Sequence, residues 1–194
     1  MNWSLLSEEQ RTKAIVPVRC GSYCGTAFLV EGTNLLTARH VVDEYFNGGK
    51  PVLACFEGKD YTFVPKQVQS KGYHANDVVL LTCNDAGFAQ IQSVKELYLK
   101  LLSIPYDQIE CAKLSVIGFP TELGGGNCQI ETCVRPHSHI IDNNRKYDVV
   151  TVREGAFKLK SFCGYSGSPV LTQIGYVVGV VSTENFGKLT FCSV

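Results

Sequence analysis

Short runs rich in Val, Ile, Phe, Tyr and Thr follow one another along almost the whole chain, and Gly, Asn, Asp or Pro separates most of them. Strands of this length, divided by turn residues at regular spacing, are typical of an antiparallel sandwich or barrel and not of alternating β-α-β units. The sequence therefore predicts an all-β fold. The expected strands are 14–20, 24–31, 34–38, 51–56, 60–69, 77–83, 111–118, 128–135, 147–153, 168–174, 176–182 and 188–193.

Two stretches depart from the strand pattern. SLLSEEQRTKAI, residues 4–15, predicts a short amphipathic helix, which Ser4 or Ser7 can cap and whose first turns suit Glu8 and Glu9. Residues 89–108 have room for a helical turn or two around Val94–Leu102, and Pro105 ends it. We expect a linker at about 91–108, between β-rich halves at about 14–90 and 109–194.

Composition narrows the classes of function. Lys plus Arg and Asp plus Glu number 18 each in 194 residues, and this balance argues against a broad nucleic-acid surface. No secretory signal and no membrane-crossing run is visible, so nine cysteines favour reduced thiols in a cytoplasm. The spacings Cys20–Cys24 and Cys128–Cys133 fit a zinc knuckle poorly. We expect no metal, no cofactor, and neither nucleic acid nor membrane as a partner.

The stretch FCGYSGSPVL, residues 162–171, places Ser166 between Gly164 and Gly167. One interpretation is a tight loop that contains a serine. The other is a nucleophile at a sharp turn, with the N–H groups of Gly164 and Ser166 forming an oxyanion hole. Ser168 is a rival nucleophile, but a proline follows it directly; Cys163, as the nucleophile of a cysteine-dependent hydrolase, is a further alternative.

A serine nucleophile also needs a base and a carboxylate. His40 directly follows the apolar run LLTAR, where a strand gives way to a turn or short helix, so its side chain can face a cleft. His74, His137 and His139 lie in polar stretches and are expected in surface loops. Asp77 opens the buried strand VVLLTC, where an acid is costly unless it is hydrogen-bonded, although HAND also suits a turn or cap.

His40 in LLTARHVV, Asp77 in NDVVLL and Ser166 in GYSGSPV resemble the three signature blocks of chymotrypsin/trypsin-like serine peptidases, in that family's order. GTAFLV, LSVIGFP and GYVVGVVS are similar to the bacterial HtrA-like branch and to related intracellular trypsin-like domains. The resemblance implies two antiparallel six-stranded β-barrels with the active site in the cleft between them.

The resemblance also implies the roles. His40 would be the general base and then the general acid, Asp77 would orient it, and Ser166 would attack, with the N–H groups of Gly164 and Ser166 holding the oxyanion. The expected function is a serine endopeptidase that cleaves proteins through an acyl-enzyme, as a regulated intracellular effector or quality-control protease. The alternative is an inactive trypsin-like fold that serves as a protein-binding scaffold.

By resemblance, Lys160 lies at the base of the specificity pocket, Cys163 forms a wall, and a second wall follows Ser182 at Thr183 and Glu184. At the base of the pocket, Lys160 would favour an acidic side chain in the substrate. Glu184 would either neutralise that lysine or select a basic side chain itself. Alternatively, Lys160 is simply a solvated residue outside any pocket.

Tyr165 stands where trypsin-type zymogens carry an Asp, so activation by a newly cut N-terminus is not expected. We expect ligands or assembly to order the site instead. We hypothesise that the chain is the N-terminal part of a longer protein that also carries a regulatory sensor domain. Alternatively, a separate partner protein regulates it.

Overall fold

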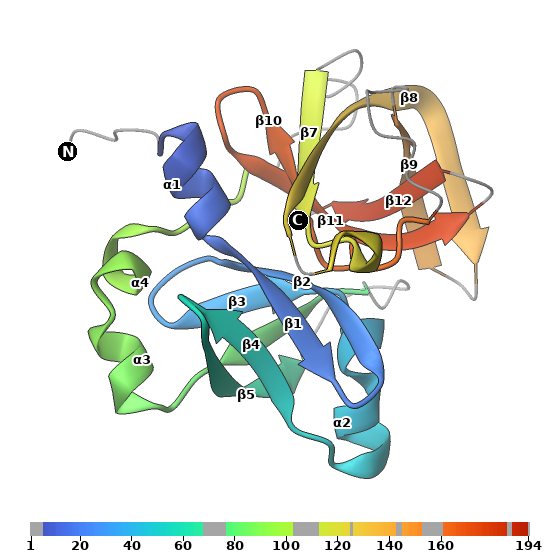
Figure 1. Ribbon diagram of the computed structural model, residues 1–194. Helices are drawn as coiled ribbons and strands as arrows, with labels where there is room; N and C mark the ends of the chain where they lie inside the picture. Colours follow the sequence, from blue (N-terminus) through green and yellow to red (C-terminus); the bar gives the residue numbers. More distant parts are fainter. Residues whose placement is uncertain are drawn as a thin grey trace.

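The computed structural model describes residues 6–67, 77–102, 113–124, 126–142, 145–152, 161–185 and 188–193, and it is mostly β (Figure 1). Six antiparallel strands close the first barrel in the order β1-β2-β3-β6-β5-β4, with β4 pairing back onto β1. Its strands are β1 (Ile15–Cys20), β2 (Tyr23–Leu29), β3 (Asn34–Thr37), β4 (Val52–Phe56), β5 (Lys59–Gln67) and β6 (Val79–Thr82).

An aromatic cluster fills one end of this barrel. Phe88, on the short helix α3 (Ala86–Gln90), is fully buried. Its ring centroid lies 5.6 Å from that of Phe56, 5.0 Å from that of Tyr61 and 5.2 Å from that of Phe63. Phe88 thus belongs to the same buried cluster as these three rings, and α3 is part of the barrel core. Truncating such a ring to alanine typically costs about 3–5 kcal/mol. The sequence did not predict this helix, because its five residues carry no helical period.

The other six strands form a second antiparallel sheet in the order β10-β11-β12-β9-β8-β7, and β10 also pairs with β7. These strands are β7 (Lys113–Gly118), β8 (Cys128–Asp142), β9 (Arg145–Val152), β10 (Pro169–Thr172), β11 (Val177–Asn185) and β12 (Lys188–Ser193). All twelve predicted strands are thus present, and the fold is mostly β, with short helices between the strands.

Strand β8 is longer than predicted and corrects the assignment of two histidines. It continues past residue 135 to Asp142, because its second half pairs with β9 in the register Ile140↔Tyr147 and Asp142↔Arg145. His137 and His139 therefore lie within a strand and not in a surface loop. The polar composition of this segment gave no strand signal, although pairing with β9 stabilises it as a strand. His74 lies outside the described residues.

The first helix, α1 (Glu8–Lys13), confirms its prediction. Ser7 caps it in a capping box with Gln10, and Glu8 and Glu9 occupy its first turn. Arg11 reaches from α1 to the turn between β10 and β11, where its Nη1 donates to the carbonyl of Gln173 at 3.4 Å. The helix therefore contacts the second sheet as well as the first barrel.

The connection between the two halves differs from the prediction. Helix α4 spans Gln92–Glu96, and the helical turn expected as far as Leu102 is absent from residues 97–102. This segment is extended because both sheets take up its backbone: the Leu99 N–H donates to Leu29 at 2.8 Å, and the Val177 N–H donates to the Lys100 carbonyl at 2.9 Å. Pro105 lies outside the described residues.

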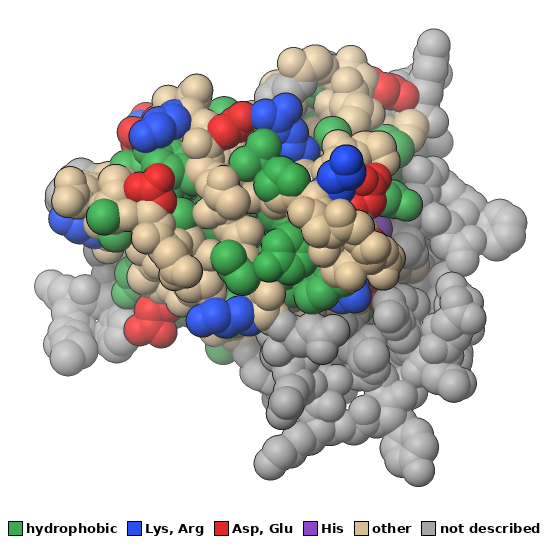
Figure 2. All heavy atoms as spheres, turned by 90° about the horizontal axis from the view of Figure 1, so that it is seen from below, with side chains coloured by type: hydrophobic (Ala, Val, Ile, Leu, Met, Phe, Trp, Pro, Cys, Tyr) green, Lys and Arg blue, Asp and Glu red, His purple; other side chains and the backbone are tan. Residues whose placement is uncertain are grey.

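One face of the molecule carries charged side chains of both signs (Figure 2). On the face shown in Figure 2, basic and acidic side chains are interspersed among hydrophobic ones, and neither sign gathers into a large patch. Among the described residues, no helix is long and apolar enough to cross a membrane.

Candidate active site

His40 lies where strand β3 ends. The chain turns there into the one-turn helix η1 (Arg39–Val42), as the sequence predicts. Ala38, Val41 and Val42 are buried around it, whereas the His40 side chain keeps 31 % of its surface exposed. The buried neighbours fix the backbone, so the imidazole has a defined position and is still open to a substrate.

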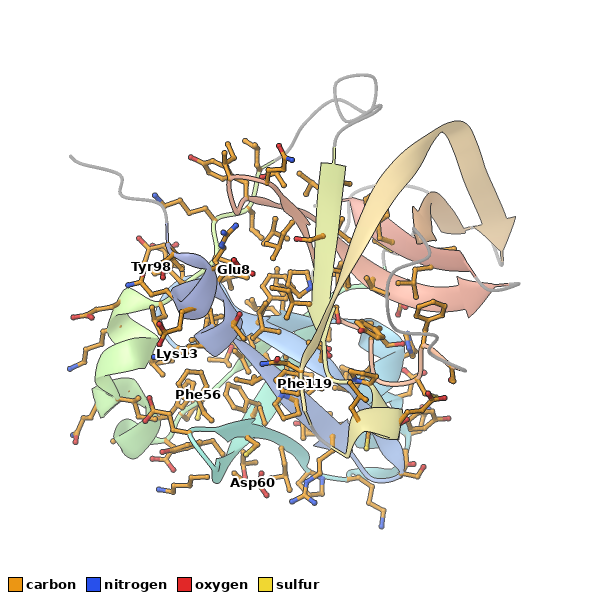
Figure 3. All side chains as sticks on the ribbon, turned by 45° about the horizontal axis from the view of Figure 1, so that its top comes forward. Glu8, Lys13, Phe56, Asp60, Tyr98 and Phe119 are labelled. Carbon is orange, nitrogen blue, oxygen red and sulfur yellow. The ribbon has the colours of Figure 1, made fainter. Side chains whose placement is uncertain are left out.

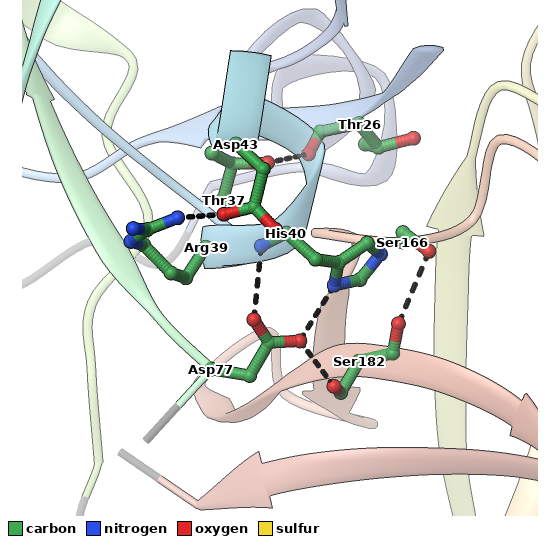
Figure 4. Close-up of polar contacts among 8 residues, drawn as sticks. All are labelled: Thr26, Thr37, Arg39, His40, Asp43, Asp77, Ser166 and Ser182. Atoms are coloured by element: carbon green, nitrogen blue, oxygen red, sulfur yellow. Dashed lines mark hydrogen bonds and ion pairs between the residues drawn. The ribbon is translucent and has the colours of Figure 1, made fainter. Parts of the chain in front are cut away.

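Asp77 lies two residues before β6, and its side chain is only 2 % exposed. The backbone N–H of His40 donates to its Oδ1 at 3.0 Å, and Nδ1 of His40 lies 2.6 Å from its Oδ2 (Figure 4). The hydroxyl of Ser182 also donates to Oδ2. These contacts satisfy the hydrogen-bonding capacity of the Asp77 carboxylate. A buried acid at this position was expected to need such hydrogen bonds.

The pKa of Asp77 reflects this surrounding. Burial by itself raises it, but the hydrogen bond and charge of His40 and the hydrogen bonds from Ser182 and the His40 backbone outweigh burial, so the pKa lies below its ordinary value of 3.8. The ionised Asp77 carboxylate accepts a hydrogen bond from the N–H at Nδ1 of His40, which leaves Nε2 of the neutral imidazole as an acceptor. Nε2 is the atom that a general base needs.

Two successive turns present Ser166. The Tyr165 N–H donates to the Phe162 carbonyl at 3.0 Å, and the Ser168 N–H donates to the Tyr165 carbonyl at 2.9 Å. Gly164 and Gly167 occupy the third position of these turns with φ of +96° and +88°, a region that suits glycine. A Cβ at Gly164 would lie 2.1 Å from the Phe119 carbonyl oxygen, so the turn has no room for a side chain either.

The loop leaves two N–H donors free beside Ser166. The Cys163 carbonyl accepts a hydrogen bond from the Thr121 N–H at 3.0 Å, so the Gly164 N–H of the same planar peptide points the opposite way. Within the described part of the chain, neither the Gly164 nor the Ser166 N–H donates to a protein acceptor. Two free backbone donors on one loop are suited to hold a negatively charged oxygen.

Thr26 of β2 fastens this loop to the first barrel, and sequence reasoning missed it. Its N–H donates to the Ser166 carbonyl at 2.8 Å, and its hydroxyl donates to the Gly164 carbonyl at 2.7 Å. The same hydroxyl accepts the Phe119 N–H at 3.1 Å, while the Thr26 carbonyl accepts the hydroxyl of Thr37 at 2.7 Å (Figure 4). The threonine in GTAFLV was the available signal, but its partners Phe119, Gly164 and Ser166 lie more than 90 residues away in sequence.

The Ser166 hydroxyl does not bond to His40 in this conformation. It donates to the Ser182 carbonyl at 3.1 Å, and among the described residues it makes no hydrogen bond to the imidazole (Figure 4). Rotation of its side chain would redirect the proton, and such contacts often tighten only when a substrate is bound. Ser168, the rival nucleophile, is fully buried, so a substrate cannot reach it.

The predicted substrate pocket is described only in part. Cys163 is exposed beside the loop. Ser182 is fully buried, and its side chain is engaged with Asp77, so only its main chain can face a substrate. Thr183 and Glu184 lie on β11 where its pairing with β12 shifts register, but their side chains are outside the described part. Lys160 also lies outside it.

The described residues hold free thiols but no cluster of metal-ligating side chains. Cys20, Cys24, Cys55, Cys83, Cys163 and Cys192 are free thiols. No group of three or more His, Cys, Asp or Glu side chains in the described part is placed to hold a metal ion.

A sequence model of the trypsin-like peptidase domain matches residues 25–180, a stretch that contains His40, Asp77 and Ser166. The chain belongs to the trypsin-like peptidases. No curated protein sequence matches this trypsin-like peptidase. Its membership therefore rests on the domain match and on the fold described above.

Solved structures of serine proteases have the same fold. The Rv3671c protease of M. tuberculosis in its inactive form is 19 % identical, with a TM-score of 0.71 over 96 % of this chain and 86 % of that one. Its active form is 21 % identical, with a TM-score of 0.68 over 96 % and 78 %. A human pathogenic astrovirus serine protease is 18 % identical, with a TM-score of 0.61 over 94 % and 90 %. At these identities the likeness shows the fold alone.

Proposed function

We propose that this trypsin-like peptidase is an active serine endopeptidase that hydrolyses polypeptides through an acyl-enzyme, with Ser166 as nucleophile, His40 as base and Asp77 as the group that orients it. The second six-stranded sheet then serves as the second barrel of a double-barrel fold. The observation that carries the proposal is the buried Asp77 carboxylate 2.6 Å from His40 Nδ1, on the opposite side of the imidazole from the nitrogen that must take the serine proton.

The first half of the reaction forms the acyl-enzyme. The Ser166 hydroxyl turns from the Ser182 carbonyl and gives its proton to His40 Nε2, while its oxygen bonds to the scissile carbonyl carbon. The carbonyl oxygen takes up the displaced electron pair and is held by the N–H groups of Gly164 and Ser166. The C–N bond then breaks, and the leaving amine receives the proton from Nε2.

The second half repeats these steps with water. His40 removes a proton from a water molecule, the resulting hydroxide attacks the acyl carbon, and Ser166 leaves as its alkoxide and regains the proton. Asp77 stays ionised throughout and stabilises the imidazolium in each half. Removal of one oxyanion donor typically lowers kcat by about 10²–10³-fold, so the backbone of the loop around Ser166 would contribute directly to the rate.

The substrate side of the site extends the proposal. Once Ser166 turns toward His40, the Ser182 carbonyl is free to accept an N–H from the substrate backbone. We keep Lys160, Cys163, Thr183 and Glu184 as candidates for the specificity pocket. We keep the role of a regulated intracellular protease as part of the proposal. Tyr165, which stands where trypsin-type zymogens carry an Asp, is fully buried and packs against Phe162 at a ring distance of 6.0 Å, so it offers no carboxylate to a newly cut N-terminus.

A peptide library tests the activity. Wild-type protein and Ser166→Ala are incubated with peptides from a digested proteome, and new termini are mapped by mass spectrometry. The proposal expects new termini with wild type and none with Ser166→Ala. Equal cleavage by both would contradict the role of Ser166, and binding without cleavage by wild type would favour the scaffold alternative.

A further inference from the structure

Residues 118–121, which end β7 and follow it, pack against the loop of the candidate nucleophile. A Cβ at Gly118 would lie 2.6 Å from Cδ1 of Tyr165, and a Cβ at Gly164 would lie 3.1 Å from Cα of Pro120. The two stretches of chain are thus so close that neither glycine has room for a side chain. We call residues 118–121 the support segment.

The support segment is itself held by the rest of the fold. Phe119 is partly buried against the hydrophobic core, and its N–H donates to the Thr26 hydroxyl of the first barrel at 3.1 Å. Figure 3 shows Phe119 at the end of β7 that lies over the first barrel. Gly118 and Pro120, on either side of it, are buried. The segment therefore offers the nucleophile loop a fixed surface.

The support segment ends in a single main-chain hydrogen bond to the loop. Thr121 begins the one-turn helix η2 (Thr121–Leu123), and its N–H donates to the Cys163 carbonyl at 3.0 Å. Both residues are exposed. Within the described part of the chain, no other group donates to this carbonyl. The direction of the Cys163 carbonyl therefore depends on Thr121.

That direction decides where an oxyanion donor points. The Cys163 carbonyl and the Gly164 N–H belong to one planar peptide and point opposite ways. Rotation of this peptide would turn the N–H away from the oxyanion and bring the carbonyl into its place. Because Cys163 lies three residues before Ser166, the spacing of a β-turn hydrogen bond, the rotated carbonyl would also accept the Ser166 N–H. One lost hydrogen bond would thus remove both donors.

We propose that the main-chain N–H of Thr121 is the positioning group that keeps the two oxyanion donors turned toward the substrate. This inference rests on the proposed endopeptidase function. Thr121 acts through the Cys163 carbonyl and is not itself a catalytic residue. Glycine at position 164 accepts φ of either sign, so the rotated peptide is open to the loop once the Thr121 bond is lost. The bond therefore selects the active arrangement.

A proline at position 121 removes the N–H. Pro120 has φ of −61° and ψ of 133°, an extended conformation that suits a residue before proline, and Thr121 is the first residue of η2, where proline is tolerated. The proline Cδ would stand where the N–H now points, so the Cys163 carbonyl must turn away. We expect Thr121→Pro to lower kcat about 10²-fold and to leave KM within about twofold, because an oxyanion donor is lost.

A second variant removes the N–H without adding an atom. An ester at position 121, made by replacing Thr121 with the corresponding α-hydroxy acid, should lower kcat about three- to tenfold, the usual worth of one hydrogen bond. It covers a failure of Thr121→Pro to fold. Thr121→Ala keeps the N–H and should lose no more than about threefold.

Glu8→Pro is the matched control for the proline. Glu8 likewise begins a helix, α1, after an extended residue, since Ser7 has φ of −63° and ψ of 165° (Figure 3). Within the described part of the chain, no group accepts its N–H. Glu8→Pro should therefore leave kcat and KM as in wild type.

Two inhibitors give a readout that a purely structural role would not move. A peptide aldehyde forms an adduct that carries an oxyanion, whereas the matching peptide alcohol forms no adduct. Thr121→Pro should weaken binding of the aldehyde about 10²-fold and leave binding of the alcohol within about twofold. Equal weakening of both, or a wild-type kcat in both the proline and the ester variant, would overturn the inference.

Amide hydrogen exchange separates this inference from the proposed function. In wild type, exchange should be slower at Thr121 than at Gly164 and Ser166, and Thr121→Pro should slow it at Ser166. If wild type hydrolyses no peptide and binds the aldehyde no better than the alcohol, the proposed function fails, yet this exchange pattern still supports the role of Thr121. Unchanged exchange at Ser166 would then overturn it. If peptides are cleaved with the same kcat by wild type and both N–H variants, the function stands and the inference is wrong.

Discussion

The hydroxyl of Thr26 donates a hydrogen bond of 2.7 Å to the carbonyl of Gly164. Thr26 belongs to the first barrel and Gly164 to the loop of the candidate nucleophile, so this one contact joins the two halves of the molecule at the proposed oxyanion donors. The Thr26 hydroxyl is fully buried and also accepts the Phe119 N–H at 3.1 Å. Its removal would leave the buried Gly164 carbonyl and the partly buried Phe119 N–H without this partner.

Thr26→Val keeps the shape of the side chain and removes the hydroxyl. We expect kcat to fall about 10–100-fold with little change in KM, because the Gly164 N–H loses its fixed direction. Affinity for a peptide aldehyde, whose adduct carries an oxyanion, should fall in parallel. Thr26→Ser should restore both. If Thr26→Val lowers only the melting temperature, the residue is structural and does not position the oxyanion donors.

Gly164→Ala tests the turn itself. The new Cβ would meet the Phe119 carbonyl oxygen at 2.1 Å in a backbone with φ of +96°, so the loop must shift and activity should fall by about 10²-fold or more. Gly58→Ala is the control, since its φ is +79° but no atom lies within 4 Å of the new Cβ. It should cost about 1–2 kcal/mol of stability and leave kcat/KM unchanged. Equal activity of the two variants would contradict the tight turn.

The lowered pKa of Asp77 predicts a pH dependence of stability. A carboxyl whose folded pKa lies below its unfolded value of about 3.8 stabilises the fold above that pH and loses this contribution as the pH falls through the folded pKa. The free energy of unfolding of wild type should therefore drop toward that of Asp77→Asn below about pH 4. Urea denaturation of both proteins from pH 2.5 to 7 measures it, and a difference that stays constant over this range would refute the assignment.

Ser182 and Ser168 are two fully buried serines with different surroundings. Ser182 donates to the Asp77 carboxylate, whereas the Ser168 hydroxyl has no hydrogen-bond partner among the described residues. Ser182→Ala should cost about 1.5–3 kcal/mol of stability, the usual worth of a hydrogen bond to a charged group. Ser168→Ala should cost less than about 0.5 kcal/mol or stabilise the protein. Chemical denaturation of the pair decides, and equal losses would count against the Asp77 network.

The parts of the fold that were predictable from the sequence are those with local signals. Alternation and turn residues located the strands, and Ser7 with Gln10 gave the N-terminal helix. The parts that were not predictable depend on distant partners. Helix α3 is stabilised by the packing of Phe88 against rings of the first barrel, which lie far from it in sequence. The second half of β8 is a strand only because β9 pairs with it.

The residues of the candidate site also differ in whether a local sequence signal marks them. His40, Asp77 and Ser166 each stand in a short sequence context that marks a strand end or a sharp turn, so each could be singled out locally. That the three belong to one site was predicted from the resemblance of their ordered blocks to those of trypsin-like peptidases. Thr26 and the side chain of Ser182 act through residues 138 and 105 positions away, and no local pattern announces such contacts.

The central claim is that Ser166 is a nucleophile activated by His40, and reaction with a fluorophosphonate probe tests it most directly. The probe is incubated with wild type, Ser166→Ala, His40→Ala and Ser168→Ala, and the labelled peptide is located by mass spectrometry. The account predicts labelling at Ser166 in wild type and in Ser168→Ala, and none in the other two variants. An unlabelled wild type, or equal labelling of Ser166→Ala, would contradict it.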